Sequence, residues 1–200
     1  MFFFTIWGGA EVRPRDPDNV VVTVWGGTEI LLPTLAEKML RIKKVKTDTG
    51  EITDAVIRRT NVITLMGGTT YRKPTLAREI EEMKEIKESR SIPESEMIDL
   101  WQEVLRREDM DLFESLTIMG GCGDDVPGLK VQLKDLNRIA SRGIISSDEK
   151  KELRALLEGT DTARPDAVQE KLRSMLLPVT DPLPAPASSK ATPIRSALLE

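Results

Sequence analysis

The sequence predicts an α+β fold: a small β-sheet of repeated strand–Gly-Gly–strand units with packed helices, followed by a C-terminal helical hairpin. Three observations predict it. A Gly-Gly tag recurs four times after β-rich runs, two tags lead through a proline into amphipathic stretches, and three more helical segments follow the last tag. The expected parts are a β-rich domain with inserted helices (1–126), a helical hairpin (127–159), a short helix (160–177) and a disordered Pro/Ala/Ser-rich tail (178–200).

Each tag consists of Thr, an aliphatic residue, Trp or Met, and then two glycines. β-branched and bulky residues suit a half-buried strand, and glycine permits the positive φ that a tight turn between strands needs. If Gly27 has a positive φ, Gly27→Val should lower the free energy of unfolding by more than about 1 kcal/mol. No second strand is expected after the fourth tag. The glycines assigned to structural turns are Gly8, Gly9, Gly26, Gly27, Gly67, Gly68, Gly120 and Gly121.

The second and third tags belong to a longer duplication. Residues 26–36 and 67–77 agree at seven of eleven positions, and both end in Pro-Thr-Leu-Ala. Proline suits the first turn of a helix, and apolar residues then recur at helical spacing. Each unit is expected to read strand–turn–strand–proline–helix, and stacked units would bury a common apolar face. Between the two units, 47–54 should form a polar turn and 52–66 a strand pair that bends near Asn61.

Further helices are expected after the third unit. Pro93 precedes an amphipathic segment. Residues 129–159 read as helix, turn and helix, with Ser146 and Glu149 spaced as a capping box, and 165–177 offer another amphipathic helix. The apolar stripe expected after Pro93 consists of Met97, Leu100, Trp101, Val104 and Leu105.

The glycine tags resemble the Gly-Gly-Val-Glu-Ile-x-x-Pro repeats of the LiaF-like cell-wall-active antibiotic response family. Residues 8–14 (GGAEVRP) and 26–33 (GGTEILLP) carry the resemblance. Members of that family usually carry membrane helices, which this sequence does not show, followed by a β-rich repeat domain facing the cytoplasm. The resemblance implies regulation of an envelope-stress signalling system through protein contacts.

Residues 129–158 resemble a short C-terminal (SHOCT) domain, with a leucine-bearing helix, a Gly-Ile-Ile turn, a Ser-x-x-Glu helix start and a closing Leu-Leu. That family usually has an aromatic residue where Lys150 or Lys151 stands, and any helical hairpin remains an alternative interpretation. SHOCT domains are proposed to act in oligomerisation or interaction. The resemblance implies contacts through Leu133, Leu136, Ile144, Ile145, Leu156 and Leu157.

Composition narrows the functional classes. The net charge of −4 disfavours nucleic acid as the main ligand, because phosphate binding requires a basic field. The sequence contains no histidine, which excludes histidine acid–base chemistry and Ser-His-Asp triads. A single cysteine, Cys122, cannot form an internal disulfide and fits a reducing compartment.

Residues 120–125 (GGCGDD) are the one stretch that resembles a chemical site. A glycine-rich loop can hold phosphate, but the P-loop lysine is missing and Asp124 and Asp125 would repel an anion. The aspartates could bind a hard cation, alone or with Glu114, while they oppose the low pKa that a redox-active Cys122 requires. A structural loop is the favoured interpretation, with no catalytic residue, metal or cofactor expected.

The favoured function is a non-enzymatic bacterial interaction or regulatory protein with protein partners, self-assembly and a cytoplasmic location. One alternative is a membrane-surface protein at the inner face of the membrane, docking through 2–7 and a basic patch. A metal-binding protein or enzyme using Cys122, Asp124 and Asp125 is another. The sequence leaves open whether the N-terminal strand pairs within its own chain or with another chain's edge. The patch consists of Arg41, Lys43, Lys44 and Lys46.

Overall fold

The structure, a computed structural model, describes residues 2–13, 19–50, 60–107, 113–159 and 165–176. Within these ranges, eight strands form two four-stranded sheets that are parallel throughout. The first sheet consists, in spatial order, of β1 (Phe2–Trp7), β3 (Val20–Trp25), β5 (Thr60–Met66) and β7 (Phe113–Met119). The second consists of β2 (Ala10–Val12), β4 (Thr28–Leu31), β6 (Thr69–Arg72) and β8 (Cys122–Asp125).

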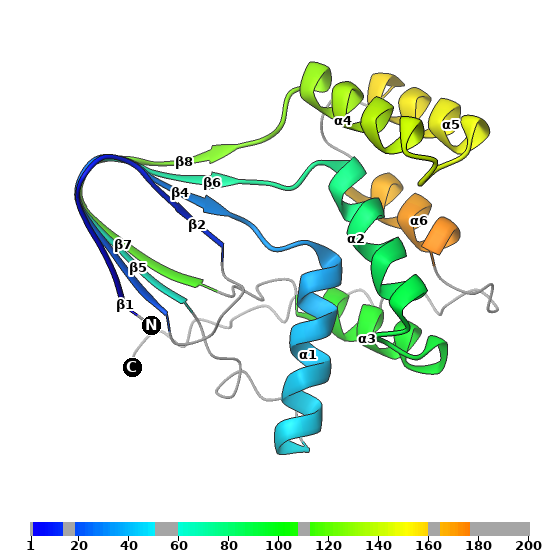
Figure 1. The fold of residues 1–200 in the computed structure, drawn as a ribbon, viewed down its shortest axis with the longest axis horizontal. Coiled ribbons are helices and arrows are strands. Elements are labelled where there is room, and N and C mark those ends of the chain that lie inside the picture. The colour runs from blue at the N-terminus through cyan, green and yellow to red at the C-terminus, as the bar shows by residue number, and fades with distance from the viewer. Residues whose placement is uncertain (1, 14–18, 51–59, 108–112, 160–164, 177–200) are drawn as a thin grey trace, which may run out of the picture.

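Each Gly-Gly pair bends the chain from the first sheet into the second, so the four units form a stack of arches (Figure 1). The two strands of one unit do not pair with each other. Instead, each strand pairs in register with the corresponding strand of the next unit, as Trp7 does with Trp25 and Trp25 with Met66. The predicted mixture of strands and helices is confirmed, whereas the prediction of one small sheet is wrong, because the bends separate two sheets.

Two local predictions about strands are also wrong. β8 follows the fourth tag, although Cys-Gly-Asp-Asp has little intrinsic preference for a strand, because its backbone pairs with β6. Asn61 lies inside β5, opposite Val20, and no bend occurs there. The earlier half of the expected strand pair, residues 52–59, lies outside the described residues.

Six helices are described, and those that follow β4, β6 and β8 lie on the side opposite the bends (Figure 1). Buried residues from all six form one apolar core, with Met39, Ile80, Trp101, Leu136 and Leu153 among its most buried members. This core continues across the expected boundary between 126 and 127. The helices are α1 (Leu35–Thr49), α2 (Leu76–Ser89), α3 (Glu94–Arg106), α4 (Leu129–Ser141), α5 (Ser147–Gly159) and α6 (Pro165–Leu176).

The helix boundaries refine the expectations from the sequence. Pro33 lies one residue before the N-cap of α1, Thr34, rather than inside the first turn. α1 ends at Gly50 in the left-handed conformation, so the first residues of the expected polar turn at 47–54 are helical. Leu105 is exposed, while the other four residues of the α3 stripe are buried. The expected tail at 178–200 lies outside the described residues.

The inside of the arches holds a short apolar cluster and a ladder of threonine hydroxyl groups. Val12, Val21, Ile30 and Val62 form the cluster. Nearer the bend, hydrogen bonds link the hydroxyl groups of Thr28 and Thr23 (3.0 Å), Thr64 and Thr28 (2.8 Å), Thr69 and Thr64 (3.2 Å), and Thr69 and Thr117 (2.7 Å). The ladder crosses between the sheets and satisfies polar groups that the stacking buries.

The first glycine of each pair is the one that the bend constrains. Gly26 has φ +132°, and a Cβ atom built there would lie 2.1 Å from the carbonyl oxygen of Gly8. At Gly67 the corresponding distance to the Gly26 oxygen is 2.0 Å. Gly27 has no positive φ, and its Cβ would make an ordinary 3.6 Å contact. The expected strain therefore belongs to Gly26 rather than to Gly27.

We predict that Gly26→Ala lowers the free energy of unfolding by about 3 kcal/mol or more, because the side chain meets both an unfavourable φ and a carbonyl oxygen. Gly27→Ala, the matched control one residue later, should change it by less than about 1 kcal/mol. Chemical denaturation of both variants measures the difference. Equal losses would mean that the arches do not approach each other as closely as the structure shows.

Candidate functional site

The outer surface of the first sheet is apolar and exposed. Because side chains alternate between the two faces of a strand, the residues beside the buried Val21, Thr23, Val62 and Thr64 point outward. On the end strands this exposure is large: Phe4 is 55%, Ile6 53%, Leu116 56% and Ile118 61% exposed. We call this surface the apolar face; it consists of Phe2, Phe4, Ile6, Val22, Val24, Ile63, Leu65, Leu116 and Ile118.

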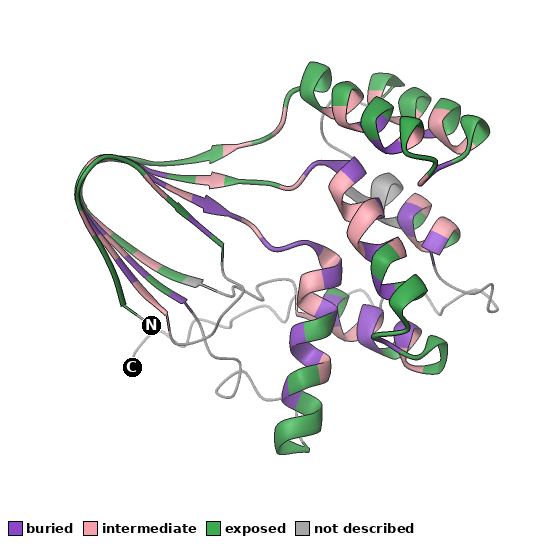
Figure 2. Ribbon diagram, viewed as in Figure 1, coloured by how far each residue is buried: buried purple, intermediate pink, exposed green. Residues whose placement is uncertain are grey.

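An aromatic row borders the apolar face at the bend. Trp7 and Trp25 are both exposed, and their rings stack with centroids 5.4 Å apart. Met66 and Met119 continue the row in the next two arches. In Figure 2, β1 at one end of the first sheet and β8 at one end of the second are exposed along most of their length, whereas the inner strands of both sheets contain buried residues. The bend therefore carries exposed aromatic and sulfur-containing side chains of its own.

The outer surface of the second sheet is charged instead. Arg72 forms ion pairs with Glu29 (2.6 Å) and with Asp125 (2.8 Å), and Arg13 forms one with Glu11 (3.3 Å). The hydrogen bond with Asp125 raises the pKa of Arg72. The two outer surfaces of the arches are therefore chemically distinct, and large apolar surface is concentrated on only one of them.

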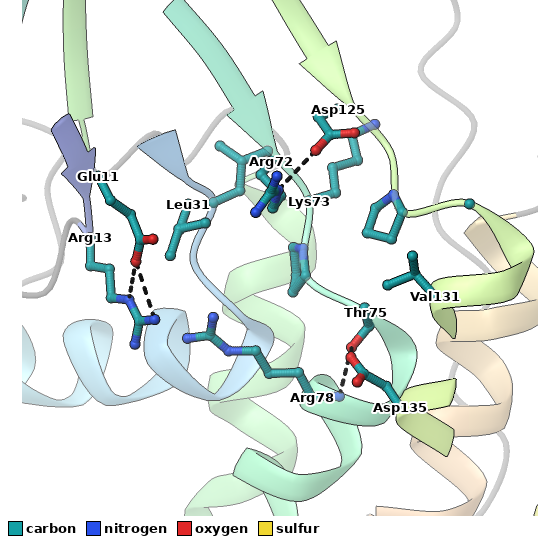
Figure 3. A pocket seen from close by; sticks show the side chains of 14 residues that line it. Glu11, Arg13, Leu31, Arg72, Lys73, Thr75, Arg78, Asp125, Val131 and Asp135 are labelled. Atoms are coloured by element: carbon teal, nitrogen blue, oxygen red, sulfur yellow. Dashed lines mark hydrogen bonds and ion pairs between the residues drawn. The ribbon is translucent and has the colours of Figure 1, made fainter. Parts of the chain in front are cut away.

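A groove of about 450 Å³ lies between the charged sheet and the starts of α2 and α4 (Figure 3). Its walls include Arg13, Arg72, Arg78 and Asp135. Arg78 pairs with Glu82 (2.8 Å) and, more distantly, with Glu37 (3.7 Å). These guanidinium groups already have carboxylate partners in the chain, so the groove does not present a concentrated charge of one sign.

The start of α1 is capped from two directions. Thr34 Oγ1 accepts from Glu37 N at 3.2 Å within the helix itself. In addition, α2 supplies Glu79, whose Oε2 accepts from Leu35 N at 2.8 Å, and Glu82, whose Oε2 accepts from the Thr34 hydroxyl at 2.5 Å. The neighbouring unit thus satisfies the Leu35 N–H at the helix start and holds the hydroxyl group of the N-cap residue Thr34.

The start of α2 repeats this arrangement with α4. Gln132 Oε1 accepts from Leu76 N at 2.9 Å, and Asp135 Oδ2 accepts from the Thr75 hydroxyl at 3.0 Å. The two capping side chains are again three positions apart on the next helix. α4 itself begins after Pro127 with Gly128 as its N-cap, which has no side-chain cap. Helix capping therefore runs from each unit to the next and ends at α4.

Glu79 is the strongly perturbed acid in this arrangement. Its carboxyl group lies at the junction of α1 and α2, where burial raises its pKa from 4.5 to about 7. The Leu35 N–H and Lys38 oppose this rise, while Glu82 and Glu37 add to it. Gln132, the corresponding residue of α4, makes the same bond without a charge. Through its bond to the Leu35 N–H, Glu79 caps α1.

The GGCGDD stretch predicted from the sequence forms the fourth bend and β8. Asp125 pairs with Arg72, and Cys122 is exposed, with its Sγ 3.6 Å from Thr117 Oγ1. Across the described ranges, no group of three or more histidine, cysteine or acidic side chains is arranged to hold a metal ion. The structure therefore brings Asp125 to a basic partner within the chain.

The predicted interaction residues of 129–158 lie largely in the protein's own core. Leu136 and Ile145 are buried, and Leu133 is partly buried. Ile144, Leu156 and Leu157 pack against the same helical core. The capping box is present, with Glu149 N 3.1 Å from Ser146 Oγ and Ser146 N 2.6 Å from Glu149 Oε2. These apolar side chains already contact the rest of the chain.

The basic patch is divided by the fold. Arg41 is buried, and Lys43 donates to the backbone oxygen of Ser91 at 2.6 Å. Only Lys44 and Lys46 of the four are exposed. α1 also lies on the side opposite the bend that carries Trp7 (Figure 1).

Residues 2–7 form a short apolar run, from which the sequence predicts a buried strand. The strand is present as β1, but the predicted burial is wrong, because Phe2, Phe4 and Ile6 are exposed. The middle of the apolar face comes from continuous apolar runs in β3 and β5. Such runs are typical of strands that are covered on both faces. Here no described helix covers the outer surface of the first sheet. The apolar runs therefore supply both the cluster inside the arches and the apolar face outside them.

Comparisons with known proteins give no relative: no protein-family model matches the sequence, and neither does any curated protein or solved structure. Among the described helices, none combines the length and the apolar character needed to cross a bilayer.

We predict that Glu79→Gln flattens the dependence of stability on pH. Between pH 4.5 and 7 the folded wild type holds the Glu79 proton more tightly than the unfolded chain, so its stability falls as pH rises through this window. The full loss is on the order of 3 kcal/mol. Glu79→Gln should remove it and be more stable at pH 8, since an amide can accept from Leu35 as Gln132 does from Leu76.

Urea denaturation at pH 5 and pH 8 measures this effect. Glu85→Gln, on the exposed surface of α2, is the control and should keep the wild-type difference between the two pH values. A Glu79→Gln variant that is less stable than wild type at pH 8 would contradict the assignment.

Proposed function

We propose that this chain is a non-enzymatic bacterial interaction protein with a regulatory role, and that the apolar face binds a protein partner. The exposure of Phe4, Ile6, Leu116 and Ile118 in aligned rows is the observation that carries the proposal. Contiguous apolar surface of this kind marks interaction sites in soluble proteins. The neighbouring tryptophans and methionines belong to residue types that are enriched at protein interfaces.

The link to envelope-stress signalling rests on the resemblance of the glycine tags to LiaF-like repeats. On the basis of this resemblance, we propose that the partner is a component of a bacterial signalling system. The proposed location is the cytoplasm, near the inner face of the membrane. The arches supply the recognition surface, and the helices on their other side form a core of their own.

Peripheral membrane contact is the second candidate. The stacked and exposed pair Trp7 and Trp25 at the bend favours it, because tryptophan prefers the membrane–water interface. The basic patch lends it little support, since only Lys44 and Lys46 are exposed and α1 lies away from the bend. Binding to a protein partner is therefore the function that we propose.

We predict that Val22→Thr combined with Ile63→Thr weakens partner recovery about tenfold or more in a crosslinking pull-down from the native host. These two residues are adjacent in the middle of the apolar face, and threonine keeps the preference for a strand. Glu11→Ala with Thr70→Ala, on the outer surface of the second sheet, is the control and should recover the partner as wild type does.

Deleting the helical hairpin at 129–158 would not test binding cleanly, because it would remove Leu136, Ile139 and Leu153 from the core. The point variants leave this core intact. Flotation with anionic vesicles tests the membrane alternative on the same proteins. Recovery of the same partners by both double variants would show that the apolar face is not the binding surface.

A further inference from the structure

Both ends of the stack of arches are open. β1 and β7 are the edge strands of the first sheet, and β2 and β8 are those of the second. In the described residues each of them pairs on one side only, which leaves a row of N–H and C=O groups free to pair. Because every pairing is parallel, the step that relates one arch to the next would also place a further arch on either end.

We propose that copies of this chain stack head to tail, with the β1–β2 arch of one copy extending the two sheets at the β7–β8 arch of the next. This inference concerns the edges of the sheets and stands apart from the partner proposed for the apolar face. Stacking would extend that face rather than cover it. The occupant of each edge is therefore another copy of this chain. The contact is heterologous, because two different surfaces meet: the β1–β2 edge of one copy and the β7–β8 edge of the next.

The side chains at the two ends match row by row. Phe4, Val22, Ile63 and Leu116 occupy one row of the first sheet, so Phe4 of the next copy would lie beside Leu116. Trp7 would lie beside Met119, and Ile6 beside Ile118, by the same register. All six side chains at this junction are about half exposed or more, whereas Val22 and Ile63 in the middle strands are partly buried. The junction would cover them as the internal arches cover each other.

Charge is complementary in the second sheet. Leu31, Arg72 and Asp125 share a row. Arg13 follows Val12, which pairs with Ile30, so the same register continued by one residue places Arg13 in this row at the other end of the stack. Arg13 of the next copy would therefore lie beside Asp125. Within one copy, Arg72 pairs with Glu29 and with Asp125, and Asp125 is the last charged group of this series. In the stack, the guanidinium group of Arg13 from the next copy would extend the series.

The interior of the arches also fits head-to-tail stacking. The threonine ladder ends at Thr117, and Thr5 occupies the same row at the opposite end. Gly8 has the left-handed conformation of an internal bend, with φ +110°, but nothing lies within 4 Å of a Cβ atom built there. At Gly26, Gly67 and Gly120 that space holds the preceding glycine's backbone. In the stack, the backbone of Gly120 from the neighbouring copy would fill it.

A disulfide ladder tests the register. Ala10 and Cys122 share one row but lie at opposite ends of a copy, about 14 Å apart, which is too far for a disulfide. Across the proposed junction their Cα atoms would be about 5 Å apart, within the normal range. Mild oxidation of full-length Ala10→Cys should therefore give dimers, trimers and longer chains on a non-reducing gel, in which the thiol introduced at position 10 of one copy is bonded to Cys122 of the next.

Two controls make this result specific. Wild type, with Cys122 alone, and Ala10→Cys combined with Cys122→Ser can each link only two chains. A ladder confined to Ala10→Cys supports the stack. Products that stop at dimers, or bonds that join like positions, would overturn it.

A second pair of variants separates end-to-end stacking from association through the apolar face. Ile6→Lys with Ile118→Lys places like charges across the junction, and should weaken self-association about tenfold or more in analytical ultracentrifugation. Ile6→Asp with Ile118→Lys changes the same two exposed positions but places opposite charges there, and should assemble as wild type does. Equal loss in both variants, or a wild type that stays monomeric, would contradict the stack.

Discussion

The close approach of glycine backbones at the bend is the contact on which the rest of this structure depends. Parallel pairing continues through each bend, with Gly26 N 2.9 Å from Met66 O and Thr28 N 2.9 Å from Gly68 O. Such pairing leaves no room for a Cβ atom at the first glycine, since an oxygen of the neighbouring arch occupies that position. Because the bends stack directly, the strands on both sides take the same register, and equivalent residues align in rows.

Those rows explain how one repeated motif builds three different environments. Positions that face inward gather threonines near the bend and aliphatic residues further along, and their hydroxyl groups satisfy one another. Positions that face outward give an apolar surface on one sheet and an ion-paired surface on the other. The helices then add a separate core, attached to the arches through short Pro-containing connections.

Much of this architecture can be predicted from the sequence, since the glycine tags and the Pro-Thr-Leu-Ala segments are local signals. The two-sheet arrangement could not be, because a Gly-Gly pair suits a hairpin as well as an arch. β8 was missed because pairing with β6, rather than residue preference, makes Cys122–Asp125 a strand. The helix caps at Glu79 and Gln132 lie 44 and 56 residues from the N–H groups that they accept from, beyond the reach of a local pattern.

These distant caps set the order in which the units are completed during synthesis of the chain. When α1 leaves the ribosome, Glu79 and Glu82 have not yet emerged, so the first helix initially has only its own Thr34 as a cap. α2 in turn waits for Gln132 and Asp135. Each nascent unit is thus completed by its successor, and the N-terminal units acquire their full set of contacts only after the C-terminal ones have emerged.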